Sequence, residues 1–443
     1  MDIKLSDHFT CARLIRFTLP SMGMLIIATL YSIVDGFFIS NFVGKTAFVG
    51  INLIFPFIAI PGTLGFMVGT GGSALVSKLL GEGDSEKANS VFSLLIYASA
   101  ITGLALTLGC LPLIRPVAEA LGAEGEVLEA AVLYGWWLVP GLTPMILQFM
   151  FQSFFSLAEN PRLGLLVTLA AGVVNVVFDV LFIIVFGWGL SGAAAATLLG
   201  LLTGTVLPLA YFGRPNQSRL RIGRTRLDWQ ALLKACTNGS SELMSNVSMS
   251  IVAMLFNFQL MRLAGENGVA AYGVIMYVTY IFSSVFLGYA FGSIPIIGYH
   301  FGAHNVPELR GLFRRSVGIN AVFGILLTGA AVALARPLAE IFVGYDEELL
   351  AMTEHAFVLY SLSFLLAGLN IFASSLFTAL NNGLISALIS FLRTLLFQVV
   401  AVLALPLFLG IDGIWLAVLT AEVGAFIVTA FCIRVMRRVY GYM

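Results

Sequence analysis

Arg115-Pro-Val-Ala-Glu119 recurs as Arg336-Pro-Leu-Ala-Glu340, 221 residues further along a chain of 443 residues. The same offset, without a gap, pairs eight other residues of the first half with identical residues of the second. Gly71, Gly81, Phe92, Phe151, Ser153, Asn160, Gly189 and Gly192 are repeated as Gly292, Gly302, Phe313, Phe372, Ser374, Asn381, Gly410 and Gly413. Because chance does not keep such a register, the sequence predicts two structurally equivalent halves.

The composition indicates which solvent surrounds this fold. Hydrophobic residues make up 59% of the chain, charged residues make up 10%, and the mean hydropathy is +0.98. Such a chain has too few polar side chains to cover a water-exposed globule, so an all-α polytopic membrane protein is predicted. A helix crosses a bilayer with about 20 apolar residues. Twelve spans are expected, at 14–40, 46–78, 88–113, 127–157, 162–187, 189–212, 237–263, 268–300, 311–335, 349–378, 382–409 and 411–433.

The number of spans in each half determines how the halves are related. Six is an even number, so both halves enter the membrane in the same direction and are expected to be related by a pseudo-two-fold axis along the membrane normal. This parallel repeat predicts two six-helix lobes with a central cleft. The expected domains are an N-terminal lobe at 1–212, a basic connector at 213–236 and a C-terminal lobe at 237–443.

Lys and Arg are distributed unevenly between the two sides of the predicted membrane. The termini, the connector and the even-numbered loops contain 18 of the 23 cations. Positive charge accumulates on the cytoplasmic side of membrane proteins, so both termini and the connector are expected there. Within the connector, the segment from Arg226 to Lys234 is expected to be either an amphipathic helix on the membrane surface or a solvated linker.

Among the charged side chains of the predicted spans, we single out five as intramembrane, where a charge costs roughly 2.5 to 3.5 kcal/mol on insertion scales. They are Asp35, Asp179, Glu242, Arg393 and Glu422. In the repeat register they face Phe256, Val400, Ser21, Gly172 and Leu201, so none of them is duplicated. Residues common to both halves are expected to be architectural. Charges found in only one half need another reason, and we interpret them as candidates for function.

Two of these charges, Asp35 and Asp179, are predicted at similar depth in the outer half of the first lobe. On the fifth span, Thr168, Asn175 and Asp179 are spaced by seven and four residues and share one helical face. Burial favours the neutral form of a carboxyl group, and an amide one turn away can hydrogen-bond either form. This pattern predicts reversible protonation. The alternative is a purely structural hydrogen bond between packed helices.

The other three charges are predicted at middle to inner depth in the second lobe. The seventh span has a polar face that we expect to line the cleft. This face comprises Glu242, Asn246, Ser250 and Asn257. Arg393 is expected either to neutralise Glu242 or Glu422 in a structural ion pair or to contact the substrate. His300 and His304 lack companion ligands and are expected in a solvated cytoplasmic loop.

Three stretches of the sequence together resemble one family of membrane proteins. They are Val34-Asp-Gly-Phe-Phe-Ile-Ser-Asn-Phe-Val-Gly44, Leu80-Gly-Glu-Gly-Asp84, and Asn175-Val-Val-Phe-Asp179 followed by Gly192 to Thr197. In this order and at these positions they are similar to the multidrug and toxin extrusion (MATE) transporters, and to a MepA-like bacterial branch among them. The resemblance covers nearly the whole chain.

The resemblance implies a multi-pass exporter of the bacterial inner membrane. Such a protein exchanges amphipathic, often cationic compounds for inward-moving protons or sodium ions. The positions that match the family's first-lobe ion site are Asp35, Asn175, Asp179 and Thr197. Pro20 matches a proline whose helix bending is linked to protonation. The chain departs from this branch at Glu242, near where other relatives have an acidic residue on the seventh helix.

The expected partners follow from the same interpretation. They are small amphipathic or cationic organic compounds, protons or sodium ions, and the lipid bilayer. No nucleic acid is expected as a partner, and the protein is expected to be a monomer. Candidate contacts in the cleft are Tyr31, Glu242, Asn246, Asn257, Arg393 and Glu422. The sequence has no nucleotide-binding loop, nucleophile elbow or zinc-protease helix, so no cofactor, no metal other than a possible sodium ion, and no enzyme activity are expected. The alternative function is a flippase or exporter of lipid-linked saccharide or another lipid-like substrate.

Overall fold

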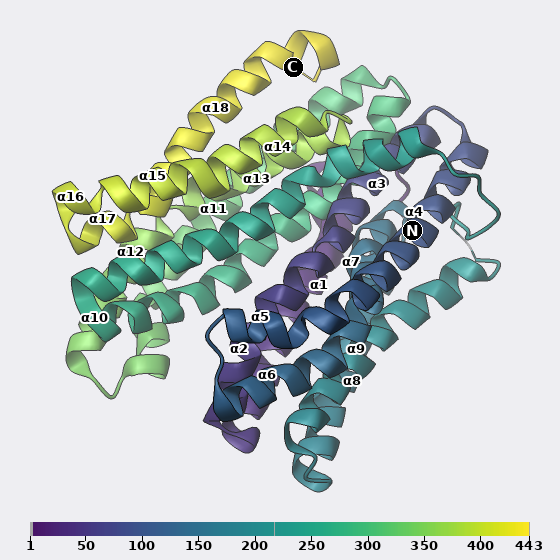
Figure 1. Cartoon of the computed structure of the whole chain (residues 1–443). Helices are drawn as coiled ribbons and strands as arrows, with labels where there is room; N and C mark the ends of the chain where they lie inside the picture. The colour runs from purple at the N-terminus through teal and green to yellow at the C-terminus, as the bar shows by residue number, and fades with distance from the viewer. Residues whose placement is uncertain (1–2, 217, 443) are drawn as a thin grey trace.

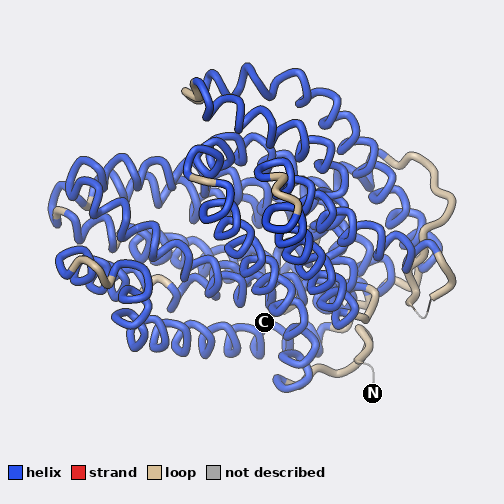
Figure 2. Tube along the Cα trace, turned by 90° about the horizontal axis from the view of Figure 1, so that it is seen from below, coloured by secondary structure: helices blue, strands red, loops and turns tan. Residues whose placement is uncertain are grey.

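A computed structural model describes residues 3–216 and 218–442, and within these residues the regular secondary structure is entirely helical (Figure 2). The first half comprises α1 (Cys11–Phe38), η1 (Ile39–Val43), α2 (Lys45–Gly62), α3 (Leu64–Gly81), α4 (Ser85–Cys110), η2 (Leu111–Leu113), α5 (Ile114–Ala120), α6 (Gly125–Leu138), η3 (Val139–Gly141), α7 (Leu142–Leu157), α8 (Pro161–Asp179), η4 (Val180–Val185) and α9 (Gly189–Gly213). The second half comprises α10 (Trp229–Gly302), α11 (Val306–Val343), α12 (Glu347–Ser361), α13 (Phe364–Ala379), α14 (Gly383–Phe391), η5 (Leu392–Leu396), α15 (Phe397–Ala404), α16 (Pro406–Leu409), α17 (Ile411–Trp415) and α18 (Ala417–Tyr440).

The helices account for the twelve predicted spans. Ten helical segments of the described chain are long and apolar enough to cross a membrane, and the bent pair α12 and α13 makes an eleventh. The 74-residue α10 contains two spans, because its backbone leaves the helical region at Gly265 (φ 60°, ψ −149°). That conformation is easily reached only by glycine. The predicted fold of two six-helix lobes is therefore confirmed.

The repeat is visible in how equivalent helices begin. The side chain of Asp84 accepts a hydrogen bond from the backbone N–H of Lys87 and caps α4. At the equivalent position of the second lobe, Asn305 caps α11 by accepting from the N–H of Glu308. Both residue types stabilise a helix start by occupying one of its free N–H groups. The two lobes thus use the same turn with different capping residues, and α4 and α11 are equivalent helices.

The two lobes meet at one end of the molecule and diverge toward the other (Figure 1). Helices α3 and α10 form most of the contact between them, and α1 also packs on α10. The contact passes through the repeated glycines. A Cβ atom at Gly81 would overlap the backbone of Tyr299 and Ala303, and one at its partner Gly302 would overlap the backbone of Lys78. The prediction that the repeated residues are architectural agrees with these positions.

Both ends of the described chain lie where the lobes meet. The side chain of His8 contacts Glu308, near the start of α11. Two residues further along α11, the Arg310 guanidinium donates to the carbonyl oxygen of Gly441. The connector differs from its expected boundaries, because α10 already begins at Trp229 instead of 237. The residues from Trp229 to Lys234 form the first turns of this membrane helix, and so they form neither a separate surface helix nor a solvated linker.

Candidate functional site

The acidic residues of the first lobe lie at the ends of two adjacent helices. Asp35 is in the last turn of α1, and Asp179 is the last residue of α8. Their carboxyl groups are close enough to act on one another electrostatically. The hydroxyl of Thr197, on α9, donates to Asp35 Oδ1 at 3.4 Å. The structure therefore brings together the predicted residues of three separate spans.

On the α8 side of this cluster the polar atoms are buried and incompletely paired, whereas Asp35 and Thr197 are half-buried. Asp179 has no exposed surface, and Asn175 and Thr168 are 2% and 3% exposed. Within the described residues, neither carboxyl oxygen of Asp179 and neither side-chain polar atom of Asn175 meets the geometry of a hydrogen bond. Almost all buried polar groups in proteins are paired, so an unpaired group needs an explanation. Such oxygens can take up a proton or a small hard cation such as Na⁺.

Both aspartates immediately precede a change in helix geometry. Asp35 lies one turn before the π-helical segment η1, and Asp179 is followed directly by the π-helical segment η4. A π-helical segment widens the turn and is frequently found at functional sites. The two segments contact each other, so α1 and α8 have the same irregularity at the same place.

Two further polar residues near the cluster were not predicted from the sequence. Tyr134 on α6 is 2% exposed and lies within reach of Thr197 and of both aspartates. Gln148 on α7 is 3% exposed, and its amide lies near the hydroxyl of Tyr31. Tyr31 itself is half-buried, and its ring faces Gly172 on α8. Gln148 could have been identified from the sequence, because a glutamine inside an apolar span is unusual. No comparable signal marks Tyr134.

In the second lobe, Arg393 and Glu422 form an ion pair. The guanidinium Nε lies 2.8 Å from Glu422 Oε1, and the amide of Asn370 donates to Oε2 at 2.7 Å. The Glu422 side chain is 2% exposed and that of Arg393 is 16% exposed. Of the two alternatives for Arg393, the structure favours the ion pair, and it selects Glu422 as the partner. Each charge is compensated within the lobe, as a buried pair requires.

Glu242, on α10, differs from Glu422 because it has no ion-pair partner in the part of the chain that the structure describes. Its carboxylate is half-buried and accepts no hydrogen bond within the described residues. The Asn246 amide donates to the backbone oxygen of Glu242 at 2.8 Å, so it does not reach the carboxylate. Arg393 acts on Glu242 only through a longer electrostatic interaction. Asn257, further along the same helix, is exposed.

Two other predicted positions have different outcomes. Pro20 lies inside α1 and is buried, and the helix continues through it although proline cannot donate the backbone hydrogen bond of that turn. His300 was expected in a solvated loop, and this expectation is wrong. It is 2% exposed and packs against the ring of Phe9. The neighbouring His304 is exposed, at the turn that follows α10.

These observations define a class of protein. It is a polytopic membrane protein with two equivalent six-helix lobes and a buried acidic cluster in only one of them. Residues 20–181 and 243–403 match the model of the MatE family, and the chain belongs to this family. The family resemblance predicted from the sequence is therefore confirmed.

Individual relatives agree with this assignment. The chain is 23% identical over 410 residues to the multidrug export protein MepA of Staphylococcus aureus strain MSSA476, and the match covers 92% of this chain and 90% of MepA. A crystal structure of MATE in complex with MaL6 matches with a TM-score of 0.93 at 23% identity, over 98% of both chains. An outward-facing multidrug resistance MATE family transporter of the MOP superfamily matches with a TM-score of 0.92, also at 23% identity over 98% of both chains.

Proposed function

We propose that the protein exports amphipathic, often cationic organic compounds from the bacterial cell in exchange for protons or sodium ions. The observation that carries this proposal is the fully buried Asp179, whose carboxyl oxygens are unpaired among the described residues, beside the half-buried Asp35. Membership of the MatE family and similarity to the multidrug export protein MepA support drug efflux as the activity. The protein acts as a monomer in the inner membrane. The face that carries residues 3–10 and the connector is cytoplasmic, as the distribution of Lys and Arg suggests.

The proposed cycle couples ion binding to movement of the lobes. When the lobes are closed at the cytoplasmic face, an ion from outside binds between Asp35 and Asp179, with Asn175 and Thr197 as the remaining oxygen donors. Binding changes how α1 packs on α8 beside the π-helical segments η1 and η4, and bound drug is released outward. The lobes then rock to open inward. One charge moving through 100 mV contributes about 2.3 kcal/mol to this cycle.

The second lobe contributes the substrate contact in this proposal. Glu242 lies on the polar face of α10, its carboxylate has no ion-pair partner among the described residues, and it would bind the positive charge of a substrate. Tyr31, Asn246 and Asn257 are proposed to line the same route. Because Arg393 is neutralised by Glu422, little free positive charge remains for an anionic lipid carrier. This weighs against the alternative of a flippase for lipid-linked saccharides.

Purified protein in proteoliposomes tests the proposal. Efflux of an ethidium-like dye is expected under an imposed pH gradient or an imposed sodium gradient, whichever ion is coupled. Transport that responds to neither gradient would refute ion-coupled antiport. Binding of the dye, and no binding of a lipid diphosphate, is expected for an exporter of cations, and the reverse result would favour the flippase.

A single substitution tests the ion site. Asp179→Asn keeps the size of the side chain but removes its negative charge, so ion-driven efflux is expected to fall at least about a hundredfold while the protein stays folded. The matched control is Asp412→Asn on α17, since the Asp412 side chain is 45% exposed and pairs with His355. Its efflux rate is expected to remain within about twofold of the wild type. Normal coupled efflux by Asp179→Asn would exclude Asp179 from the site.

A further inference from the structure

The segment that precedes α1 is packed into the protein at the face where the lobes meet. We define residues 3–10 as the N-terminal strap. Leu5 is 2% exposed, and Phe9 has no exposed surface. The ring of Phe9 packs edge-on against Phe17, with 5.9 Å between centroids, and against His300, at 6.4 Å. The strap therefore contributes to the core of the closed face.

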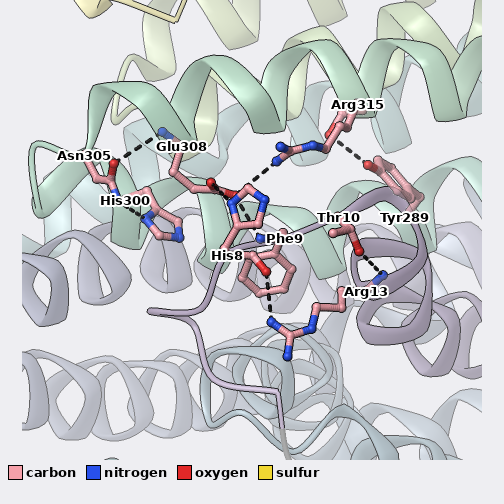
Figure 3. Close-up of polar contacts among 10 residues, drawn as sticks. His8, Phe9, Thr10, Arg13, Tyr289, His300, Asn305, Glu308 and Arg315 are labelled. Carbon is pink, nitrogen blue, oxygen red and sulfur yellow. Dashed lines mark hydrogen bonds and ion pairs between the residues drawn. The ribbon is translucent and has the colours of Figure 1, made fainter.

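The strap has polar contacts with both lobes, and Figure 3 shows those with the second lobe. In the second lobe, Glu308 of α11 receives the side chain of His8 and, at 2.9 Å, the backbone N–H of Phe9. In the first lobe, the side chain of Glu159 accepts from the N–H of Leu5 at 2.7 Å. Glu308 is 7% exposed and is also paired with Arg315 at 3.2 Å. A segment of the first lobe is thus fastened to a buried carboxylate of the second.

The connector also contains a bound segment that precedes the first helix of a lobe. We define residues 219–225 as the connector strap, which precedes the first helix of the second lobe and is bound to α4 of the first. Asn89 accepts from the N–H of Arg221 at 2.7 Å. The hydroxyl of Ser93 accepts from the N–H of Gly223 at 3.0 Å. Because α4 and α11 are equivalent helices, each lobe is led by a strap that binds the same helix of the opposite lobe.

The contacts of the two straps respond differently to separation of the lobes. The connector strap is bound to the lobe from which it continues, since α9 precedes it in the chain. Its contacts with α4 can persist while α10 moves. The N-terminal strap is joined to α1 of one lobe and bound to α11 of the other. Because the strap is continuous with α1, separation of the lobes at this face must therefore either break its contacts with Glu308 and His300 or unwind the start of α1.

We propose that the N-terminal strap is a latch that holds the cytoplasmic face closed and must leave Glu308 before the protein can open inward. This inference rests on the alternating access of the proposed function. The segment bound to α11 is the chain's own, fixed by the apolar anchor Phe9 and the His8–Glu308 pair. The latch stabilises the closed cytoplasmic face and slows the return of the lobes to the inward-open state.

Distances between spin labels test the latch. Labels are attached at Glu86→Cys on α4 and Arg314→Cys on α11, two exposed positions of opposite lobes, after the four native cysteines are replaced by Ser. Phe9→Ala removes the anchor, and His8→Ala removes only the exposed half of the ion pair, so the second variant is expected to fold even if the first does not. Lys4→Ala is the matched control, because Lys4 is exposed in the same strap and its ammonium group forms no hydrogen bond or ion pair among the described residues.

The expected result is a rise of at least about fivefold in the ratio of long to short distances for Phe9→Ala or His8→Ala, and none for Lys4→Ala. The wild-type ratio is expected to respond to pH, sodium or dye. If it does so and neither variant changes it, the latch is refuted while alternating access still stands. If the wild-type distances respond to none of these, the proposed function itself fails. The two failures are therefore distinguishable.

Discussion

At the residue scale, the two lobes use buried charge in different ways. Asp35 and Asp179 are like charges placed together, with Thr197 as the hydrogen-bond donor to one of them. Arg393 and Glu422 are opposite charges placed together, and Asn370 completes the pairing. Like charges in a buried site favour uptake of a cation, whereas a compensated pair has no such tendency. The first cluster is suited to exchange ions and the second to hold its lobe together.

Removing one partner of the ion pair tests the structural role of the second cluster. Arg393→Met leaves Glu422 buried and uncompensated, and it is expected to destabilise the protein by about 3–5 kcal/mol. The double variant with Arg393→Met and Glu422→Leu is expected to be more stable than the single one. Thermal denaturation in detergent measures the stability of both variants. Equal stability of Arg393→Met and the wild type would contradict the structural role.

Much of this residue-scale organisation was accessible from the sequence, with definite limits. An ionised carboxyl in an apolar span is costly, which is why Asp35 and Asp179 could be identified and placed at similar depth. Tyr134 could not be found in this way, because a buried tyrosine hydroxyl costs much less than a charge. The partner of Arg393 also remained open, since Glu242 and Glu422 have similar predicted depth and only the packing of α10, η5 and α18 separates them.

At the scale of helices, glycine determines how closely the lobes approach. Gly81 on α3 and Gly302 on α10 each lie against the backbone of the opposite lobe, with no room for a side chain. The sequence repeat predicted that these residues are architectural, but it did not reveal that their partners belong to the other lobe. His300 illustrates the same limit. Its burial depends on Phe9, almost three hundred residues earlier in the chain, and local sequence contains no information on such a contact.

A comparison of two glycine substitutions tests this closure. Gly81→Ala places a methyl group against the carbonyl oxygen of Tyr299, so the lobes cannot close fully and the ratio of long to short label distances is expected to rise. In the control, Gly109→Ala on α4, the added methyl group has no neighbour within 4 Å. There the loss of glycine from a helix is expected to be neutral or to stabilise by about 1 kcal/mol. An unchanged distance distribution in Gly81→Ala would show that the contact tolerates a side chain.

At the scale of the whole molecule, the orientation in the membrane is the simplest property to measure. Cys11 is exposed at the start of α1, on the proposed cytoplasmic face. Phe408 on α16 is 83% exposed and lies at the opposite end of its lobe. With the other cysteines replaced, a membrane-impermeant maleimide is expected to label Cys11 only in inside-out vesicles and Phe408→Cys only in intact cells. The opposite labelling pattern would invert the proposed direction of export.

The restriction of the acidic cluster to one lobe has a thermodynamic consequence. At the equivalent positions of Asn175, Asp179 and Thr197 the second lobe has Leu396, Val400 and Val418, so it has no second copy of the site. Under the proposed mechanism, the two carboxyl groups of the first lobe therefore limit each cycle to two monovalent ions. At 100 mV this limit corresponds to about 4.6 kcal/mol, or a concentration ratio on the order of two thousand for a neutral compound. The asymmetry of the repeat thus sets the steepest drug gradient that the membrane potential alone can maintain.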